Sequence, residues 1–171
     1  MDAGDESGRV TCLTLSLRRR DYVEGAASQV STSEQASTDG ASFLYEIVFD
    51  GGALGNPGEG YGSYVVSLGG ADIQHVRHDF GDNVTNNQAE YQTLIEALSW
   101  LASKLGSAAG ETSVKVNGDS QLVLNQLLGK WKVKNEGLRP LHREASELIR
   151  RFRVVSLVWQ RRDHSVKRLG H

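Results

Sequence analysis

The sequence has little cysteine and no long apolar run, and both absences narrow what the protein can be. Its single cysteine, Cys12, cannot form an internal disulfide or a cysteine-based metal centre, so carboxylates, histidines or carbonyls must hold any metal. Uncharged apolar stretches run for only a handful of residues, too short for a membrane-spanning helix. The N-terminal segment, residues 1–8, holds three acids and no apolar core, which excludes a secretory signal. We therefore expect a cytoplasmic protein with no membrane partner.

The charged residues are divided unevenly along a chain of 171 residues, a length that suits one domain of ordinary size. The net charge is only −2. Residues 43–119 carry 3 basic and 10 acidic side chains, a net charge of −7, whereas residues 120–171 carry 12 basic and 4 acidic side chains, a net charge of +8. Such a division is either ordinary solvated surface or a sign that the protein gathers cations at one place and phosphates at another.

A change of composition near residue 43 predicts two parts of the chain. Residues 24–42 are small and polar, with almost nothing to bury, and this pattern predicts a flexible linker. Before the linker, residues 10–17 alternate as in a possible strand. We therefore predict an N-terminal extension over residues 1–42 and a folded domain over residues 43–171.

The pattern of the folded domain predicts an α/β protein, with a mixed sheet covered by helices. Apolar segments bounded by glycine turns predict three short antiparallel strands, FLYEIVFDGG, YGSYVVSLGG and IQHVRHDFG. Helical spacing predicts helices over residues 86–104, 121–128 and 141–152, and SVKVNGDS and VVSLVWQ read as two further strands. Hairpin strands followed by alternating helices and strands are typical of such a mixed sheet.

Three acids stand where these elements begin or end. Asp50 ends the first strand, Glu90 lies near the start of the long helix, and Asp119 closes the fourth strand. If the first and fourth strands are neighbours, the three carboxylates can share one pocket, where divalent cations would relieve their mutual repulsion. Taken singly, each acid also has an ordinary explanation, as a turn residue, a partner of the helix dipole or a helix cap.

The sequence around each acid resembles the motifs of the ribonuclease H family. The segments are FDGGALGNPGEGYGSYVV, TNNQAEYQTLIEAL and VNGDSQLVLNQLLGKWKVKNEGLRPL. Within that family they are similar to the compact bacterial and archaeal type 1 ribonucleases H, also named reverse-transcriptase-like domains. The resemblance extends over about residues 43–165, with the motifs in the family's order and spacing.

This resemblance implies a fold and an activity. The fold would be ribonuclease H-like, with a five-stranded mixed sheet in the order 3-2-1-4-5 flanked by helices. The family hydrolyses the RNA strand of RNA–DNA hybrids with two Mg²⁺ ions, for which Mn²⁺ is a possible substitute, and leaves a 5′-phosphate. Its first three catalytic, metal-binding acids match Asp50, Glu90 and Asp119.

The resemblance also implies contacts to the hybrid. The family's substrate-contacting residues match Asn86, Asn87 and Gln121, and Thr85 falls where a DNA phosphate is held. Amide side chains both donate and accept hydrogen bonds, so they can read base edges and 2′-hydroxyls in a minor groove. Helix capping is an equally good explanation for Thr85. The basic segment KWKVKN offers a contact to the DNA backbone, although a tryptophan such as Trp131 is more often buried than stacked on nucleic acid and the lysines also suit an ordinary solvated face.

The last family motif is where the sequence departs. The family's fourth acid falls on Arg168, and a cation cannot ligate a metal. His171, His164 or Asp163 could take over its role, or the domain binds hybrids without cutting them well. A non-catalytic hybrid-binding module of the same fold is therefore the alternative function. A scaffold for protein interaction is a third hypothesis, although no obligatory protein partner is evident.

Overall fold

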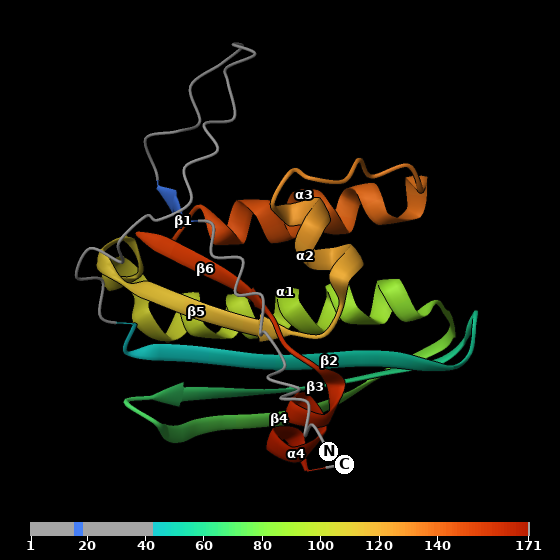
Figure 1. Ribbon diagram of the computed structural model, residues 1–171, viewed down its shortest axis with the longest axis horizontal. Helices are drawn as coiled ribbons and strands as arrows, with labels where there is room; N and C mark the ends of the chain where they lie inside the picture. Colours follow the sequence, from blue (N-terminus) through green and yellow to red (C-terminus); the bar gives the residue numbers. More distant parts are fainter. Residues whose placement is uncertain (1–15, 19–42, 171) are drawn as a thin grey trace, which may run out of the picture.

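A six-stranded mixed sheet forms the centre of the computed structural model, which describes residues 16–18 and 43–170 (Figure 1). The strand order is β1-β6-β5-β2-β3-β4. The strands are β1 (Ser16–Arg18), β2 (Tyr45–Gly55), β3 (Gly58–Leu68), β4 (Ala71–Val84), β5 (Ser113–Gly118) and β6 (Val154–Trp159). Strands β2, β3 and β4 pair antiparallel, β5 runs parallel to β2, and β6 runs parallel to β5.

The predicted strand order is confirmed, with one strand added. From β4 to β6 the strands follow the order 3-2-1-4-5 when numbered along the folded domain. The sixth strand, β1, pairs antiparallel with β6 and places Leu17 opposite Val155, so it supplies partners to backbone groups that an edge strand would leave open. The rest of the predicted N-terminal strand and the linker over residues 24–42 lie outside the described residues. The division into residues 1–42 and 43–171 stays a prediction.

Helices cover both faces of the sheet. They are α1 (Asn86–Leu105), α2 (Gln121–Leu127), α3 (Arg139–Ile149) and α4 (Arg162–Leu169), with short 3-10 helices η1 (Gly106–Glu111) and η2 (Glu136–Leu138). The third helix begins before the predicted Leu141, because Pro140 suits the first turn of a helix, and it ends at Ile149, before the predicted Phe152, where the chain turns toward β6. None of the helices in the described part of the chain is long and apolar enough to cross a membrane.

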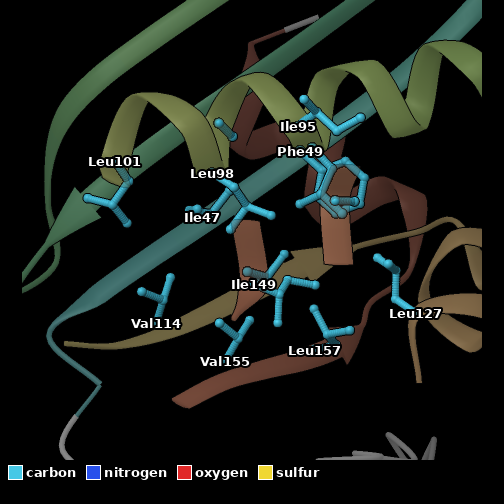
Figure 2. Close-up of a cluster of buried hydrophobic side chains, with 14 of the residues drawn as sticks. Ile47, Phe49, Ile95, Leu98, Leu101, Val114, Leu127, Ile149, Val155 and Leu157 are labelled. Atoms are coloured by element: carbon cyan, nitrogen blue, oxygen red, sulfur yellow. The ribbon is translucent and has the colours of Figure 1, made fainter. Parts of the chain in front are cut away.

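Strand alternation divides β2 between the two faces. Ile47 and Phe49 are buried in the main core, which β5, β6, α1 and α3 complete (Figure 2). Val48 points to the opposite face, where it packs with Val65 and with Leu169 of α4. Because side chains alternate along a strand, Asp50 lies on the same face as Val48, the face that α4 covers.

Candidate active site

The parallel pairing of β2 with β5 brings Asp50 and Asp119 together. Phe49 lies opposite Gly118, so the two acids follow at the next positions of adjacent strands. A Cβ at Gly118 would lie 2.5 Å from the ring of Phe49, which is why only glycine fits there. The indole Nε1 of Trp159 donates to the backbone oxygen of Asp119 over 3.0 Å and fixes the end of β5.

A close contact between β2 and α1 places Glu90 beside these acids. A Cβ at Gly51 would lie 2.6 Å from the backbone of Ala89 and Glu90, so glycine lets the strand touch the first turns of the helix. The hydroxyl of Ser120 donates to Oε2 of Glu90. The same hydroxyl accepts from the backbone N–H of Val123 over 3.3 Å, so the residue that caps α2 also orients Glu90.

Burial and mutual repulsion set the electrostatics of this acid cluster, which consists of Asp50, Glu90 and Asp119. Asp50 is only 2% exposed. Burial raises the pKa of Glu90 to about 7, with further increases from Asp119 and Asp50, although the Ser120 hydrogen bond opposes them. The pKa of Asp119 is also raised, first by burial and then by Asp50. The three carboxylates therefore act on one another, as the sequence predicted.

An arginine that the sequence analysis did not select also reaches the acid cluster. Nη2 of Arg162, at the first position of α4, lies 3.8 Å from Oδ2 of Asp50. Asp50 raises the pKa of Arg162, and Asp119 and a hydrogen bond with Tyr61 add to the effect. The sequence shows a basic residue soon after the last strand. Its contact with Asp50 depends on how α4 is oriented relative to β2, which the sequence pattern does not specify.

The donor set of the acid cluster fits a hard divalent cation. Carboxylate oxygens are the ligands that Mg²⁺ and Mn²⁺ prefer, and a cation would relieve the repulsion that raises the pKa values. In the part of the chain that the structure describes, no three Asp, Glu, His or Cys side chains are arranged as a ready-made metal site.

Two of the predicted substrate contacts also have structural roles. Thr85 is the N-cap of α1 and forms a capping box with Gln88, in which the Thr85 N–H donates to Oε1 of Gln88 over 2.9 Å. Oδ1 of Asn86 accepts from the backbone N–H of Ala53 over 2.8 Å, and the Asn86 N–H donates to Oδ1 of Asn56 over 3.2 Å. Both residues therefore fix the start of α1, and Asn86 ties it to the turn between β2 and β3.

The other predicted contacts lie near a basic groove. This cavity of about 520 Å³ is lined by Asn87, Leu122, Gln126, Lys130, Trp131, Lys132, Lys134, Asn135 and Leu138. Trp131 is 48% exposed, so it does not pack into the core. Gln121 is exposed at the first position of α2, next to Leu122 of the groove. The groove thus joins Asn87 to the predicted basic segment.

Arg168, which the sequence analysis placed at the catalytic centre, is engaged elsewhere. Its guanidinium forms an ion pair with Asp72 of β4 and donates to Oγ of Ser67 over 2.7 Å. Ser67 lies four residues beyond Ser63, the partner of Asp50 on β3, which is about 13 Å along the strand. The substitutes considered for the missing acid stay predictions: His164 and Asp163 are exposed on α4, and His171 lies outside the described residues.

Comparison with known proteins identifies the family. The family model described as reverse transcriptase-like matches residues 49–166. The bifunctional protein Rv2228c of Mycobacterium tuberculosis is 39% identical over 114 residues, which are 66% of this chain and 30% of the relative. Ribonuclease HI of Halobacterium salinarum is 34% identical over 75% of this chain and 60% of its own length. The chain thus spans less than two thirds of these relatives.

Solved structures support the same assignment. The N-terminal RNase H domain of Rv2228c is 35% identical and has a TM-score of 0.66, over 74% of this chain and 88% of that domain. LC11-RNase H1 in complex with an RNA/DNA hybrid is 29% identical, with a TM-score of 0.66, over 72% of this chain and 89% of its own. The chain therefore belongs to the reverse transcriptase-like family and has the fold of a ribonuclease H domain.

Proposed function

We propose that the protein is a divalent-cation-dependent ribonuclease H, an endonuclease that hydrolyses the RNA strand of RNA–DNA hybrids. The observation that carries the proposal is the convergence of Asp50, Glu90 and Asp119 from β2, α1 and the end of β5. A relative named ribonuclease HI and a structural neighbour bound to an RNA/DNA hybrid support it.

The acid cluster would hold the cations. Asp50 acts on both Glu90 and Asp119, so it is the acid that we expect to serve both ions, and Glu90 and Asp119 would each hold one or share them. When bound, two Mg²⁺ or Mn²⁺ ions would supply an activated water and stabilise the leaving 3′-oxygen. The hydrogen bond from Ser120 limits the rotation of Glu90, which keeps its carboxylate directed at the cluster.

The basic groove would bind the hybrid beside the acid cluster. The lysines of the groove would contact phosphates of the DNA strand, and exposed Trp131 offers a surface on which a sugar or a base can stack. Asn86, Asn87 and Gln121 would contact the minor groove, where 2′-hydroxyls distinguish RNA from DNA. Thr85 would support a DNA phosphate from the start of α1, where the helix dipole favours an anion.

A second candidate is a module that binds hybrids without cutting them. The observation in its favour is that the family's fourth acid is replaced by Arg168, whose side chain is held by Asp72. The two functions share the groove and differ only in turnover. A binding module would show hybrid affinity with steep salt dependence and no cleavage.

The test is cleavage of a hybrid labelled on its RNA strand, with Mg²⁺ or Mn²⁺ and with a chelator, by the wild type and Asp50→Asn. Cation-dependent cutting of the RNA strand that disappears in the variant is expected. If folded wild type binds the hybrid and cuts nothing with either ion, the enzyme is the wrong conclusion and the binding module replaces it.

A further inference from the structure

Arg162 is a charged neighbour of the acid cluster, and its side chain is far more exposed than that of Asp50. The side chain of Arg162 is 64% exposed, whereas that of Asp50 is 2% exposed, yet their charged atoms approach to 3.8 Å. The carboxylate is therefore fixed in the protein, and the guanidinium reaches it from a long side chain that is mostly in solvent. Such a side chain can leave the cluster without disturbing the core.

The position of Arg162 is set by the fold. Helix α4 is fixed to the sheet at its far end by Arg168, which pairs with Asp72, and by Leu169, which packs with Val48 and Val65. At the near end, the side-chain amide of Gln160 donates to the buried Ser165 hydroxyl over 2.9 Å. The start of the helix is thereby held over the face of β2 that carries Asp50.

The charge of Arg162 acts on the whole cluster. It interacts with Asp50 and Asp119, and Tyr61 of β3 holds it with a hydrogen bond. It also interacts with Glu90. One positive charge thus stands among three carboxylates, in the region where a divalent cation would have to bind. The guanidinium of Arg162 and a bound divalent cation would repel each other at such short range. Each therefore weakens the affinity of the cluster for the other.

We propose that Arg162 is a resident counter-cation of the acid cluster, which stabilises the cluster without metal and competes with divalent cations for it. This inference rests on the cation site of the proposed function. Each ion that binds must displace the guanidinium or accept its repulsion, so the free protein binds ions more weakly than the acids alone would. Once displaced, the guanidinium enters solvent, where its charge is hydrated.

The first measurement is Mn²⁺ binding by the full chain, followed as loss of the free-ion signal in electron paramagnetic resonance. Arg162→Gln should bind Mn²⁺ about three- to tenfold more tightly than the wild type, because a screened repulsion is removed. Arg162→Lys keeps the charge and should stay close to the wild type. Arg161→Gln, an equal loss of charge at the exposed neighbouring position, is the matched control and should change affinity less than twofold.

The second measurement is the melting temperature in a chelator. Arg162→Gln should melt below both the wild type and Arg161→Gln, and saturating Mn²⁺ should raise its melting temperature by more than it raises theirs. Equal or weaker Mn²⁺ binding by Arg162→Gln, while the wild type binds the ion, would overturn the inference and leave the proposed function standing. Failure of all the proteins to bind Mn²⁺ would instead overturn the cation site, and the inference with it.

Discussion

The acid cluster and the basic groove are neighbours built on opposite principles. In the cluster, carboxylates from β2, α1 and the end of β5 converge where burial makes each charge act strongly on the others. In the groove, three lysines alternate along one exposed segment, residues 130–134, where water screens them. Replacement of one carboxylate in the cluster should therefore have a large effect on activity. Replacement of one lysine in the groove should have a small effect, because the other lysines remain.

The N-terminal part of α1 joins the two regions. Asn87 lines the basic groove, and Glu90 belongs to the acid cluster three residues later, on a neighbouring part of the helix surface. The N-terminal fixation of α1 by Thr85 and Asn86 consequently positions both regions at once. A substrate phosphate held in the groove would thus be aligned with the carboxylates by one rigid helix.

Loss of one carboxylate should have the largest effect. Asp50→Asn should reduce the rate of hybrid cleavage by about a thousandfold or more, because Asp50 is expected to hold both cations. Its free energy of unfolding without cations should change little, because the loss of repulsion among the three carboxylates is offset by the loss of the ion pair with Arg162. Cleavage assays and denaturant titration measure the two effects. Asp82→Asn, at an exposed position on β4, should change neither, and equal losses of cleavage in both variants would contradict the special role of Asp50.

The raised pKa of Glu90 predicts a pH dependence of stability. Its pKa is about 7 in the folded protein against an ordinary value of 4.5, so the folded state holds a proton that the unfolded state has lost between these values. The free energy of unfolding in a chelator should therefore fall as pH rises from 4.5 to 7, by up to about 3 kcal/mol from this residue.

Glu90→Gln isolates that contribution. The amide does not titrate, so the free energy of unfolding of the variant should depend less steeply on pH between 4.5 and 7. The contributions of the other titrating groups should stay the same. Denaturant titrations of both proteins across this pH range make the comparison. Parallel slopes in the wild type and the variant would show that Glu90 does not carry the effect. Saturating Mn²⁺ should flatten the wild-type curve, because a bound cation keeps the carboxylate ionised.

Changes in the basic groove should have a smaller effect that depends on salt. Replacement of Lys130, Lys132 and Lys134 by Gln should weaken hybrid binding by about tenfold at moderate salt. The slope of log affinity against log salt should become shallower by about two to three units. Binding measured at several salt concentrations tests both values, and Lys104→Gln, on the last turn of α1, is the control. If the salt dependence of binding is the same in the variant and the wild type, these three lysines do not contact phosphates of the hybrid.

The sequence predicts the convergence of the acids better than it predicts their surroundings. Glu90 lies near the start of α1 and Asp119 directly follows β5, so local pattern and strand order bring these two acids together. The predicted end of the first strand at Asp50 is wrong, because β2 continues to Gly55 and pairs with β3 beyond Asp50. The pairing of β1 with β6 and the contact of Arg162 with Asp50 join segments more than a hundred residues apart. Such contacts depend on how whole elements are oriented, which periodicity does not specify.

Arg168 shows the same limit of sequence reasoning and leads to the smallest expected effect. Counting along the family motif placed it at the catalytic centre, but its side chain bonds to Asp72 and Ser67. Arg168→Ala should lower the free energy of unfolding by about 1 kcal/mol, since the pair is partly exposed and Ser67 keeps its bond to Asp72.

Arg168→Asp distinguishes the structural role from the family position. If the residue mainly fastens α4 to β4, a carboxylate there faces Asp72, so this variant should be less stable than Arg168→Ala and cut hybrids no faster than the wild type. Lys167→Ala, at the adjacent exposed position, controls for loss of charge from α4. Faster cleavage by Arg168→Asp would mean that α4 moves to present a fourth metal ligand, and it would return Arg168 to the catalytic centre.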